Sequence, residues 1–311
     1  MSKSTQNTEL RREQTMQEYI KKAGILIEAM PYISKFHGKT VVIKYGGSAM
    51  TDEEIKHSVI GDIAFMKMVG INPVIIHGGG PEINKALALE GVEPKFFNGL
   101  RVTDEKTMQV VEAVLSGKIN KSIVSEFQRH KTKAVGISGK DGMLIEAEKK
   151  MPDGVDIGFV GDIKKINTEV LDTLIKSDFV PVISPVGADK EANTYNINAD
   201  YAAVEIAIAL KATKLVFLTD IEGVRMNADD PESLISRLNP FEIEKMIDNG
   251  TITGGMIPKV ECCSKAIKEG VDSVHIINGK IEHSILLEIY TKDGIGTVIE
   301  EAEDEQVALI H

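Results

Sequence analysis

Two lysines stand next to glycine-rich segments, where a cation can meet a bound anion. Lys44 ends an apolar run and is followed by two glycines in "IKYGGSAM", and Lys259 follows two glycines in "TGGMIPK". Lys259 also opens a helical pattern, where a cation opposes the helix macrodipole at a cost of roughly a few tenths of a kcal/mol. We therefore expect both lysines to face an anion, although a solvated surface lysine is the alternative for Lys259.

A third glycine-rich segment, "HGGGPEIN", follows an apolar run that ends at His77. Pro81 suits the first position of a helix, and bare backbone N–H groups at a helix N-terminus form an anion site. A tight turn between a strand and a helix needs only one glycine. Three in a row therefore favour a close approach of the backbone to a ligand.

Polar side chains add to this set of groups. In an extended segment, Asn196, Asn198 and Asp200 of "YNINAD" would point to one face. Asp200 could instead cap the helix that follows it. Arg101, in "NGLRVTD", could hold a carboxylate in a bidentate fork.

Two cations, several backbone anion sites and an arginine describe a site for two anions. Phosphoryl transfer to a carboxylate fits this description, because a carboxylate is already ionised near neutral pH and needs no general base. The reaction does need in-line alignment and relief of the repulsion between the carboxylate and a triphosphate. Fixed cations and backbone N–H groups supply both.

The composition and the missing motifs argue against other classes of protein. The 311-residue chain carries a formal net charge of -11, which argues against a surface for nucleic acid or anionic membranes. The segment "AVGISGKDG" resembles a P-loop, but Ala134 replaces its first glycine. GxGxxG after a strand, HExxH, GxSxG and CxxC are absent. The dehydrogenase, metalloprotease and hydrolase classes therefore have no motif support.

The sequence also predicts where the protein works. It opens without the apolar core of a signal peptide, and no apolar run reaches the roughly 18 residues of a membrane span. Cys262 and Cys263 are adjacent, and neighbouring cysteines rarely pair. We expect a cytoplasmic protein with reduced thiols, no membrane contact and no nucleic-acid partner.

Short apolar runs rich in Val and Ile alternate with helical patterns along the chain. This alternation predicts an α/β fold, a three-layer sandwich with a mostly parallel open central sheet. The segment 144–167 differs, because its β-branched residues surround glycine turns, and it predicts hairpins on the edge of the sheet. The predicted strands are 40–44, 72–77, 133–138, 179–184, 214–219 and 273–277, and the predicted helices are 52–69, 82–90, 104–129, 200–211 and 259–269.

A further helix is predicted from residue 13 to residue 30, ahead of the first strand. Its apolar residues recur at three- and four-residue steps, as in an amphipathic helix. Pro31 is expected to end or bend it. The apolar stripe could pack on its own domain or reach a neighbouring subunit. The stripe consists of Met16, Tyr19, Ile20, Ala23, Ile27 and Met30.

The order of these segments resembles the amino acid kinase family, and within it the branch that phosphorylates N-acetyl-L-glutamate in arginine biosynthesis. The similarity runs from about residue 39 to about residue 299 without a large gap. No single segment would be specific, but so many in one order are. They include "IKYGGSAM", "VIIHGGGPEIN", "NGLRVTDEKTM", "YNINADYAA", "LTDIEGV", "GGMIPKV" and "VHIINGKIEHSILLEIYTKDGIGT".

The resemblance implies a role for each matching residue. Lys44 and Lys259 would be catalytic and stabilise the transferring phosphoryl group, and Asp200 would hold both lysines. Mg²⁺ would be carried by the nucleotide, with no metal held by the protein. The residues that would bind N-acetyl-L-glutamate are Gly79, Gly80, Arg101, Asn196 and Asn198, and those that would bind ATP are Gly46, Gly47, Thr219, Asp220, Gly254 and Gly255.

The N-terminal helix and the segment 279–297 resemble the arginine-inhibited members, which are hexamers built as trimers of dimers. His275, inside an apolar strand, would by itself be interpreted as a core histidine. Whether a nitrogen-signalling protein docks on the hexamer stays open. The residues that would bind L-arginine are Tyr32, Lys214, His275, Glu288 and Gly294.

By the same resemblance, the chain divides into three parts. Residues 1–36 would form an N-terminal tail and an oligomerisation helix. Residues 37–210 would form a lobe for N-acetylglutamate binding and dimerisation, and residues 211–311 a lobe for ATP with the arginine site.

Two alternatives remain. A kinase of the same fold could act on N-acetylaminoadipate, which differs by about one methylene, worth only about 1–3 kcal/mol in a pocket. A protein that has lost catalysis could bind arginine as a regulator. The presence of Lys44, Asp200 and Lys259 argues against that second alternative.

Overall fold

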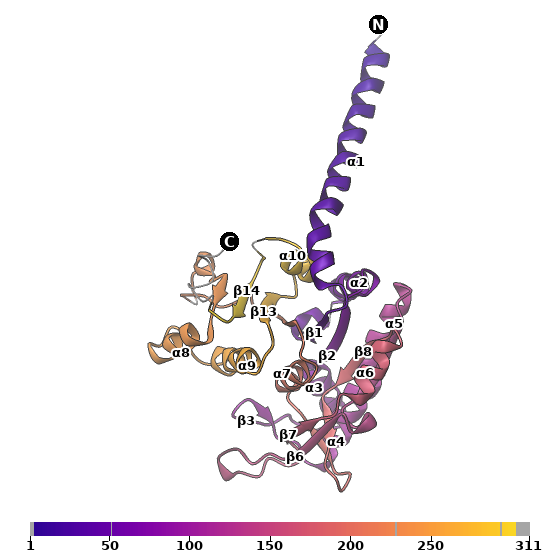
Figure 1. Ribbon diagram of the computed structural model, residues 1–311. Helices are drawn as coiled ribbons and strands as arrows, with labels where there is room; N and C mark the ends of the chain where they lie inside the picture. Colours follow the sequence, from indigo (N-terminus) through magenta and orange to yellow (C-terminus); the bar gives the residue numbers. More distant parts are fainter. Residues whose placement is uncertain (1–2, 51, 228, 293, 303–311) are drawn as a thin grey trace.

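The centre of the molecule is an eight-stranded sheet, seen in a computed structural model that describes residues 3–50, 52–227, 229–292 and 294–302 (Figure 1). The strand order is β12-β14-β13-β11-β1-β2-β8-β5, and neighbours run parallel except β13 and β14. The predicted mostly parallel sheet is confirmed. The bounds are β1 Thr40–Tyr45, β2 Asn72–His77, β5 Ala134–Ser138, β8 Val180–Ser184, β11 Lys214–Thr219, β12 Arg237–Leu238, β13 Ser273–Asn278 and β14 Thr297–Glu300.

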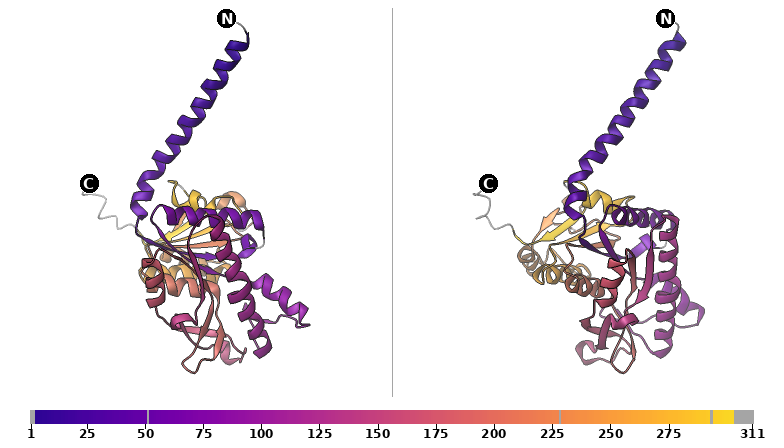
Figure 2. Two further views of the ribbon diagram at one scale, coloured as in Figure 1. Left: turned by 90° about the vertical axis from the view of Figure 1, so that its right-hand side faces the viewer. Right: turned by 45° about the vertical axis from the view of Figure 1, so that its right-hand side comes forward.

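Helices cover both faces of this sheet, which makes the predicted three layers (Figure 2). Within β1, Val42 packs into the core on one face, and Val41 and Ile43 pack into the core on the other. Successive strand side chains point to opposite faces, so a strand covered on both sides is apolar throughout. One face is covered by α6 (Glu169–Lys176), α7 (Ala199–Ala209), α8 (Pro240–Asp248) and α9 (Met256–Lys268), and the other by α2 (Glu53–Met68), α3 (Gly80–Leu89), α4 (Glu105–Glu112), α5 (Asn120–Arg129) and α10 (Ser284–Ile289).

The hairpin predicted in 144–167 exists, but its predicted place was wrong. Strands β6 (Ile145–Lys149) and β7 (Gly161–Ile166) pair antiparallel, yet they belong to a separate sheet of order β10-β9-β6-β7. Leu144 and Ile145 are buried in the core on the α7 face. The hairpin therefore belongs to a second sheet that shares this core, and it does not extend the edge of the main sheet. The other two strands are β9 Val186–Ala188 and β10 Thr194–Asn196.

The predicted helix 104–129 is interrupted by a wide turn. α4 passes into a π-helical segment, η2 (Ala113–Ile119), before α5 begins. Such segments occur mostly as single turns inside α-helices and often lie at functional sites. Here η2 faces the glycine-rich segment after β2, since a Cβ on Gly79 would overlap the side chains of Leu115 and Ile119.

The N-terminal helix α1 is longer than predicted. It spans Lys3–Phe36 and continues through Pro31, so of the two outcomes expected there, an end or a bend, the end is excluded. A proline inside a helix removes one backbone hydrogen bond, and the helix re-forms its pattern directly afterwards, with His37 N–H donating to the Ile33 carbonyl at 2.9 Å.

α1 projects away from the rest of the chain (Figure 2). The stripe residues from Met16 to Met30 are exposed, whereas Tyr32 and Ile33 are partly buried and Phe36 is buried. The alternative in which this stripe packs on its own domain is therefore contradicted for residues 16–30.

Within the described ranges, no helix combines the length and the apolar character needed to cross a bilayer. The main sheet is continuous across the predicted boundary between residues 210 and 211, because β11 pairs directly with β1. The division of the chain into lobes stays a prediction.

Candidate active site

The residues predicted for catalysis and for substrate binding gather at the carboxyl ends of the central strands, although not all of them follow a strand of the main sheet. The segments after β1 and β2 leave the main sheet directly, and Tyr45 at the end of β1 is in register with His77 at the end of β2. The segment "YNINAD" instead follows β10 of the second sheet, and "TGGMIPK" follows α8. The N-termini of α7 and α9 bring these two segments to the same place.

Lys44, Asp200 and Lys259 form one charged bridge at this point. The Lys44 ammonium lies 3.0 Å from Oδ1 of Asp200, and the Lys259 ammonium lies 2.7 Å from Oδ2. The side chains are 14%, 22% and 16% exposed for Lys44, Asp200 and Lys259. Lys259 also sits 5.1 Å from the centre of the Phe217 ring, a cation–π contact. Two cations are thus held on opposite oxygens of one carboxylate.

The pKa of Asp200 is lowered by this arrangement. Burial alone would raise it, but the two ammonium groups outweigh the loss of solvent. Asp200 therefore stays ionised and fixes the position of both lysines. It is not the N-cap of α7, because Asn198 fills that place and accepts the N–H groups of Asp200 and Tyr201. The expected extended run from Asn196 to Asp200 was wrong for the same reason, since β10 ends at Asn196.

The glycines after β1 are required by what lies next to them. A Cβ on Gly46 would overlap the Lys44 ammonium, so only glycine leaves the lysine its place. Gly47 has a φ of 72°, which favours glycine, and a Cβ there would come 2.9 Å from the Asp220 carboxylate. Gly47 and Asp220, both predicted to bind ATP, are therefore neighbours.

A hollow of about 210 Å³ is lined by all five residues predicted to bind N-acetyl-L-glutamate. Its volume is below the roughly 300 Å³ at which drug-sized ligands begin to fit, so it suits a small acid. Its lining includes Gly79, Gly80, Phe96, Arg101, Asn196 and Asn198.

Arg101 is poised for an anion in this hollow. It is 8% exposed, and Nη1 is buried without a hydrogen-bond partner. Nη2 donates weakly to the Gly80 carbonyl at 3.3 Å, and the guanidinium lies 4.9 Å from the centre of the Phe96 ring. This cation–π contact helps to hold the guanidinium, whose planar fork suits bidentate binding of a carboxylate.

Sequence reasoning missed two contributors to this hollow. Phe96 lies on the hairpin β3 (Phe96–Phe97) and β4 (Leu100–Arg101), whose turn residues Asn98 and Gly99 both have positive φ. The Asn-Gly pair between apolar residues was a readable hairpin signal. The second is η2, against which Gly79 packs. Gly79 is thus explained by packing, whereas Gly80 faces open space.

A second hollow, of about 310 Å³, lies beyond Asp220. It is lined by residues 220–225, 251–253, Met256 and Asn278. Gly255 caps α9 without any side-chain hydrogen bond. The first N–H groups of that helix are instead used locally, since Met256 N–H donates to the Thr253 carbonyl at 3.3 Å and Ile257 N–H to the Gly254 carbonyl at 3.2 Å. Thr219 does not face this hollow, because its hydroxyl donates to the Ile221 carbonyl and accepts the Ile221 N–H, which closes a turn.

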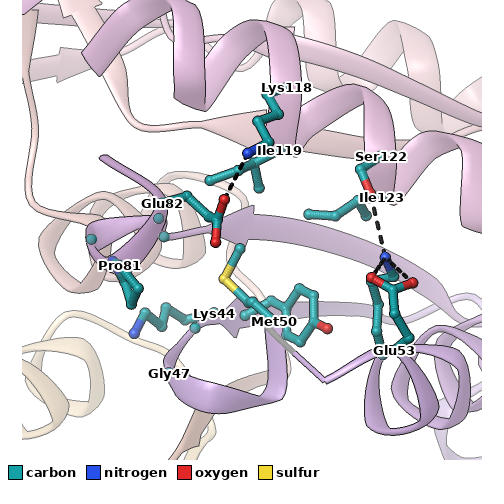
Figure 3. Close-up of a pocket in the computed structure, with 16 residues that line it drawn as sticks. Lys44, Gly47, Met50, Glu53, Pro81, Glu82, Lys118, Ile119, Ser122 and Ile123 are labelled. Atoms are coloured by element: carbon teal, nitrogen blue, oxygen red, sulfur yellow. Dashed lines mark hydrogen bonds and ion pairs between the residues drawn. The ribbon is translucent and has the colours of Figure 1, made fainter. Parts of the chain in front are cut away.

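A third hollow joins the bridge to the groove between α2 and α5 (Figure 3). Figure 3 shows Lys44, Gly47 and Pro81 on one side and Ser122 and Glu53 on the other. Lys118 pairs with Glu82 at 2.8 Å along its rim.

The residues predicted for arginine also come together, at the far end of β11 and β13. Nε2 of His275 lies 2.8 Å from the Lys214 ammonium, and Nδ1 lies 2.6 Å from Glu288. Glu288 accepts backbone N–H groups of Ile295 and Gly296. Burial lowers the pKa of His275, and Glu288 keeps a lowered pKa despite burial because of its bond to that imidazole. His275 is thus a satisfied core histidine, as its place in a strand suggested.

Of the two remaining residues predicted for arginine, Gly294 lies next to Glu288, and Tyr32 lies on α1. Gly294 has a φ of 65°, and a Cβ there would come 2.7 Å from Glu288. Tyr32 packs, partly buried, against the core that contains Ile285 and Ile289 of α10. Phe36, one turn further along α1, lies with its ring centre 5.1 Å from the Lys214 ammonium. The last turn of α1 is thus in direct contact with the cluster.

Comparisons with known proteins agree with this fold. The model of the amino acid kinase family matches residues 39–278. An acetylglutamate kinase from Caldanaerobacter subterraneus is 56% identical over 93% of this chain and 96% of its own, and one from Methanococcus aeolicus is 54% identical over 89% and 97%. The chain therefore belongs to the amino acid kinase family. Within that family it groups with the acetylglutamate kinases, which are phosphotransferases.

Among solved structures, two of N-acetylglutamate synthase from Neisseria gonorrhoeae are similar. The one complexed with coenzyme A and N-acetyl-glutamate has a TM-score of 0.81 and 26% identity, covering 91% of this chain. The one complexed with coenzyme A and L-arginine has a TM-score of 0.75 and 25% identity, covering 90% of this chain. This chain spans only 64% and 65% of those synthase chains.

Proposed function

We propose that the protein transfers the γ-phosphoryl group of ATP to the side-chain carboxylate of N-acetyl-L-glutamate, giving N-acetyl-L-glutamyl 5-phosphate and ADP. The observation that carries this proposal is the pair of ammonium groups held by Asp200. A small hollow lined by Asn198 and Ala199, next to Asp200 in the chain, contains an unpaired arginine nitrogen, and a larger hollow is lined by Met256 at the start of the helix that carries Lys259.

Each part of this arrangement suits one part of the reaction. Arg101 would bind the α-carboxylate of the substrate, which leaves the side-chain carboxylate to face the bridge. A carboxylate oxygen then bonds to the γ-phosphorus while the bond to the β–γ bridging oxygen breaks and ADP leaves. Lys44 and Lys259 offset the negative charge on the two sides of the moving group.

Mg²⁺ belongs to the nucleotide in this proposal. Both oxygens of Asp200 are engaged by ammonium groups, so this carboxylate is a poor metal ligand. Mg²⁺ keeps several waters and is usually bound through substrate phosphates. The buried thiols of Cys262 and Cys263, which form no disulfide, fit a reducing cytoplasm as the place of action.

A substrate panel tests the activity. The protein is incubated with MgATP, hydroxylamine and one acid at a time, and the acyl phosphate is trapped as a coloured hydroxamate–iron complex. We expect kcat/KM for N-acetyl-L-glutamate to exceed that for N-acetyl-L-aminoadipate by about 10–200-fold, the value of one methylene. A preference for aminoadipate, or no hydroxamate with any acid, would overturn the proposal in favour of the two alternatives.

We also propose that L-arginine inhibits this reaction by binding at the cluster of Lys214, His275 and Glu288. Glu288 is an acidic group that a guanidinium could pair with by replacing His275 on Oε1, and a similar synthase structure contains L-arginine. The contact between Phe36 and Lys214 links the cluster to α1. A hexamer in which α1 helices of neighbouring subunits cover each other's stripes would explain their exposure. A nitrogen-signalling protein as a further partner stays a prediction.

A further inference from the structure

Three side chains that could bind a metal ion gather between α2 and α5, away from the charged bridge. His57 lies on α2, Glu126 lies on α5, and His130 ends α5. The two helices lie next to each other (Figure 1). Nδ1 of His57 is 2.7 Å from Oε1 of Glu126, and Nε2 of His130 is 4.0 Å from the same oxygen.

The distances between the three ligand atoms are close to those found around a bound metal ion. Glu126 and His130 are four residues apart and therefore share one face of the helix. Each of the three residues offers one ligand atom, and these atoms all lie within 4.8 Å of one another. Ligands bonded to a tetrahedral ion at 2.0–2.2 Å are about 3.3–3.6 Å apart. Small side-chain movements would bring the three atoms to those separations.

One of these atoms lacks a partner. Nε2 of His130 is buried and makes no hydrogen bond, and buried polar groups in proteins are nearly always satisfied. Gly61 leaves room for this ring, because a Cβ there would come 3.2 Å from Cε1 of His130. The nitrogen is thus kept free and enclosed at the point where the other two ligand atoms converge.

The second oxygen of Glu126 has a partner of its own. Arg129 lies 3.2 Å from Oε2 and leaves Oε1 to the histidines. Imidazole and carboxylate groups are common ligands of transition metals.

We propose that His57, Glu126 and His130 bind one divalent transition-metal ion of the Zn²⁺ type. Two imidazoles and one carboxylate favour Zn²⁺, Co²⁺ or Ni²⁺, whereas Mg²⁺ and Ca²⁺ prefer oxygen ligands. The two histidines also border a hollow with Ser58 and His283, from which water can supply the fourth ligand. The ion would join α2, which follows the lysine loop, to α5, which follows η2.

Co²⁺ binding tests this site directly in the full-length protein. The chain is stripped with a chelator, dialysed and titrated with Co²⁺, whose visible absorption is strong in four-coordinate sites. We expect one equivalent per chain, displaced by Zn²⁺, which stands above Co²⁺ in affinity. Zn²⁺ should also raise the thermal unfolding midpoint, since it binds the folded state.

Single substitutions identify the ligands. His57→Asn and His130→Asn should each weaken Co²⁺ binding at least about 10-fold. The matched control is His37→Asn, because His37 is exposed and its imidazole bonds only the Val69 carbonyl among the side-chain contacts described. His57 is 58% exposed, so its variant should fold even if the His130 variant does not, and circular dichroism checks both. Absence of Co²⁺ binding at micromolar concentration, or unchanged binding by the folded His57 variant, would overturn the proposal and leave a plain histidine–carboxylate contact.

Discussion

The Lys259 ammonium lies 2.7 Å from Oδ2 of Asp200, although the two residues are 59 positions apart and come from different helices. Lys44, from the sheet, takes the other oxygen at 3.0 Å. Asp200 thus holds the two cations on either side of one carboxylate before any substrate binds. Such preorganisation is effective in catalysis because the charges need not be arranged during the reaction.

Removing either ammonium should therefore slow the chemical step. We expect Lys44→Ala and Lys259→Ala each to lower kcat by about 100- to 1,000-fold, by analogy with loss of one oxyanion donor. The KM for N-acetyl-L-glutamate should change little. Lys268→Ala is the control, since Lys268 lies on the same helix and pairs at the surface with Glu244. Near-normal kcat in either site variant would contradict the assignment.

The missing side chain of Gly46 gives a second prediction. A Cβ at this position would overlap the Lys44 ammonium, so Gly46→Ala should displace the lysine and lower kcat nearly as far as Lys44→Ala does. Combined in one chain, the two substitutions should be far from additive, because both act through one ammonium. Steady-state kinetics of the two single variants and the double variant measure this. Additive losses would show that Gly46 acts by another route.

Arg101 should affect substrate binding more than catalysis. Lysine keeps the charge of this residue but loses the planar fork and the stacking on Phe96. We expect Arg101→Lys to raise the KM for N-acetyl-L-glutamate about 10-fold or more, with kcat within a few-fold of normal. If the KM for ATP rose instead, Arg101 would belong to the nucleotide side of the site.

Lys214 predicts a pH dependence of stability. Burial, followed by the nearby charge of Lys35, lowers the pKa of Lys214 to about 8, against about 10.4 in an unfolded chain. Between these values the unfolded chain binds a proton that the folded chain has lost, so the contribution of Lys214 to stability rises with pH.

The test compares the unfolding free energies of the original protein and of the Lys214→Met variant, both measured by denaturant unfolding. We expect the unfolding free energy of the original protein, minus that of the variant, to increase by an amount on the order of 3 kcal/mol from pH 7.5 to pH 10.5. Lys268→Met, at the surface, should give a difference that stays flat over that range. An equally flat difference for Lys214→Met would show that its ammonium is solvated in the folded chain.

The central strands were predictable because a strand that is buried on both faces is a continuous apolar run in the sequence. β11 begins and ends where its Val- and Leu-rich run predicted, at Lys214 and Thr219. α8 carried an equally readable signal that was not used. Asn239, Pro240 and Glu242 form a capping box with proline in the first turn. α10, with only six residues, is too short for periodicity to reveal.

The candidate site was predictable in its residue types and only partly in its geometry. Lys44, Asp200 and Lys259 stood out because each is unusual for its local setting. Nothing local indicates that Asn198 rather than Asp200 caps α7, since both residue types are good caps. The contact between His57 and Glu126 joins residues 69 positions apart. It depends on how α2 packs against α5, and no local sequence pattern predicts that packing.

The exposed stripe of α1 gives the last prediction. Tyr19, Ile20 and Ile27 are all more than half exposed in the single chain, and burying them between two copies would contribute about 25 cal/mol per Å² of apolar surface, less the cost of association. α1 also ends at Phe36, which touches Lys214 of the arginine cluster. Subunit arrangement and arginine binding should therefore be coupled, each favouring the same state of the helix.

Deleting residues 1–27 should convert a hexamer into dimers and weaken inhibition by arginine, while kcat without arginine stays near normal. Light scattering measures the first effect and inhibition curves the second. Ile20→Asp should act in the same direction by placing a charge within the stripe, whereas Lys22→Asp, off the stripe, should leave the assembly intact. A truncated chain that remains hexameric would show that contacts outside α1 hold the subunits together. α1 would then not couple subunit arrangement to arginine binding.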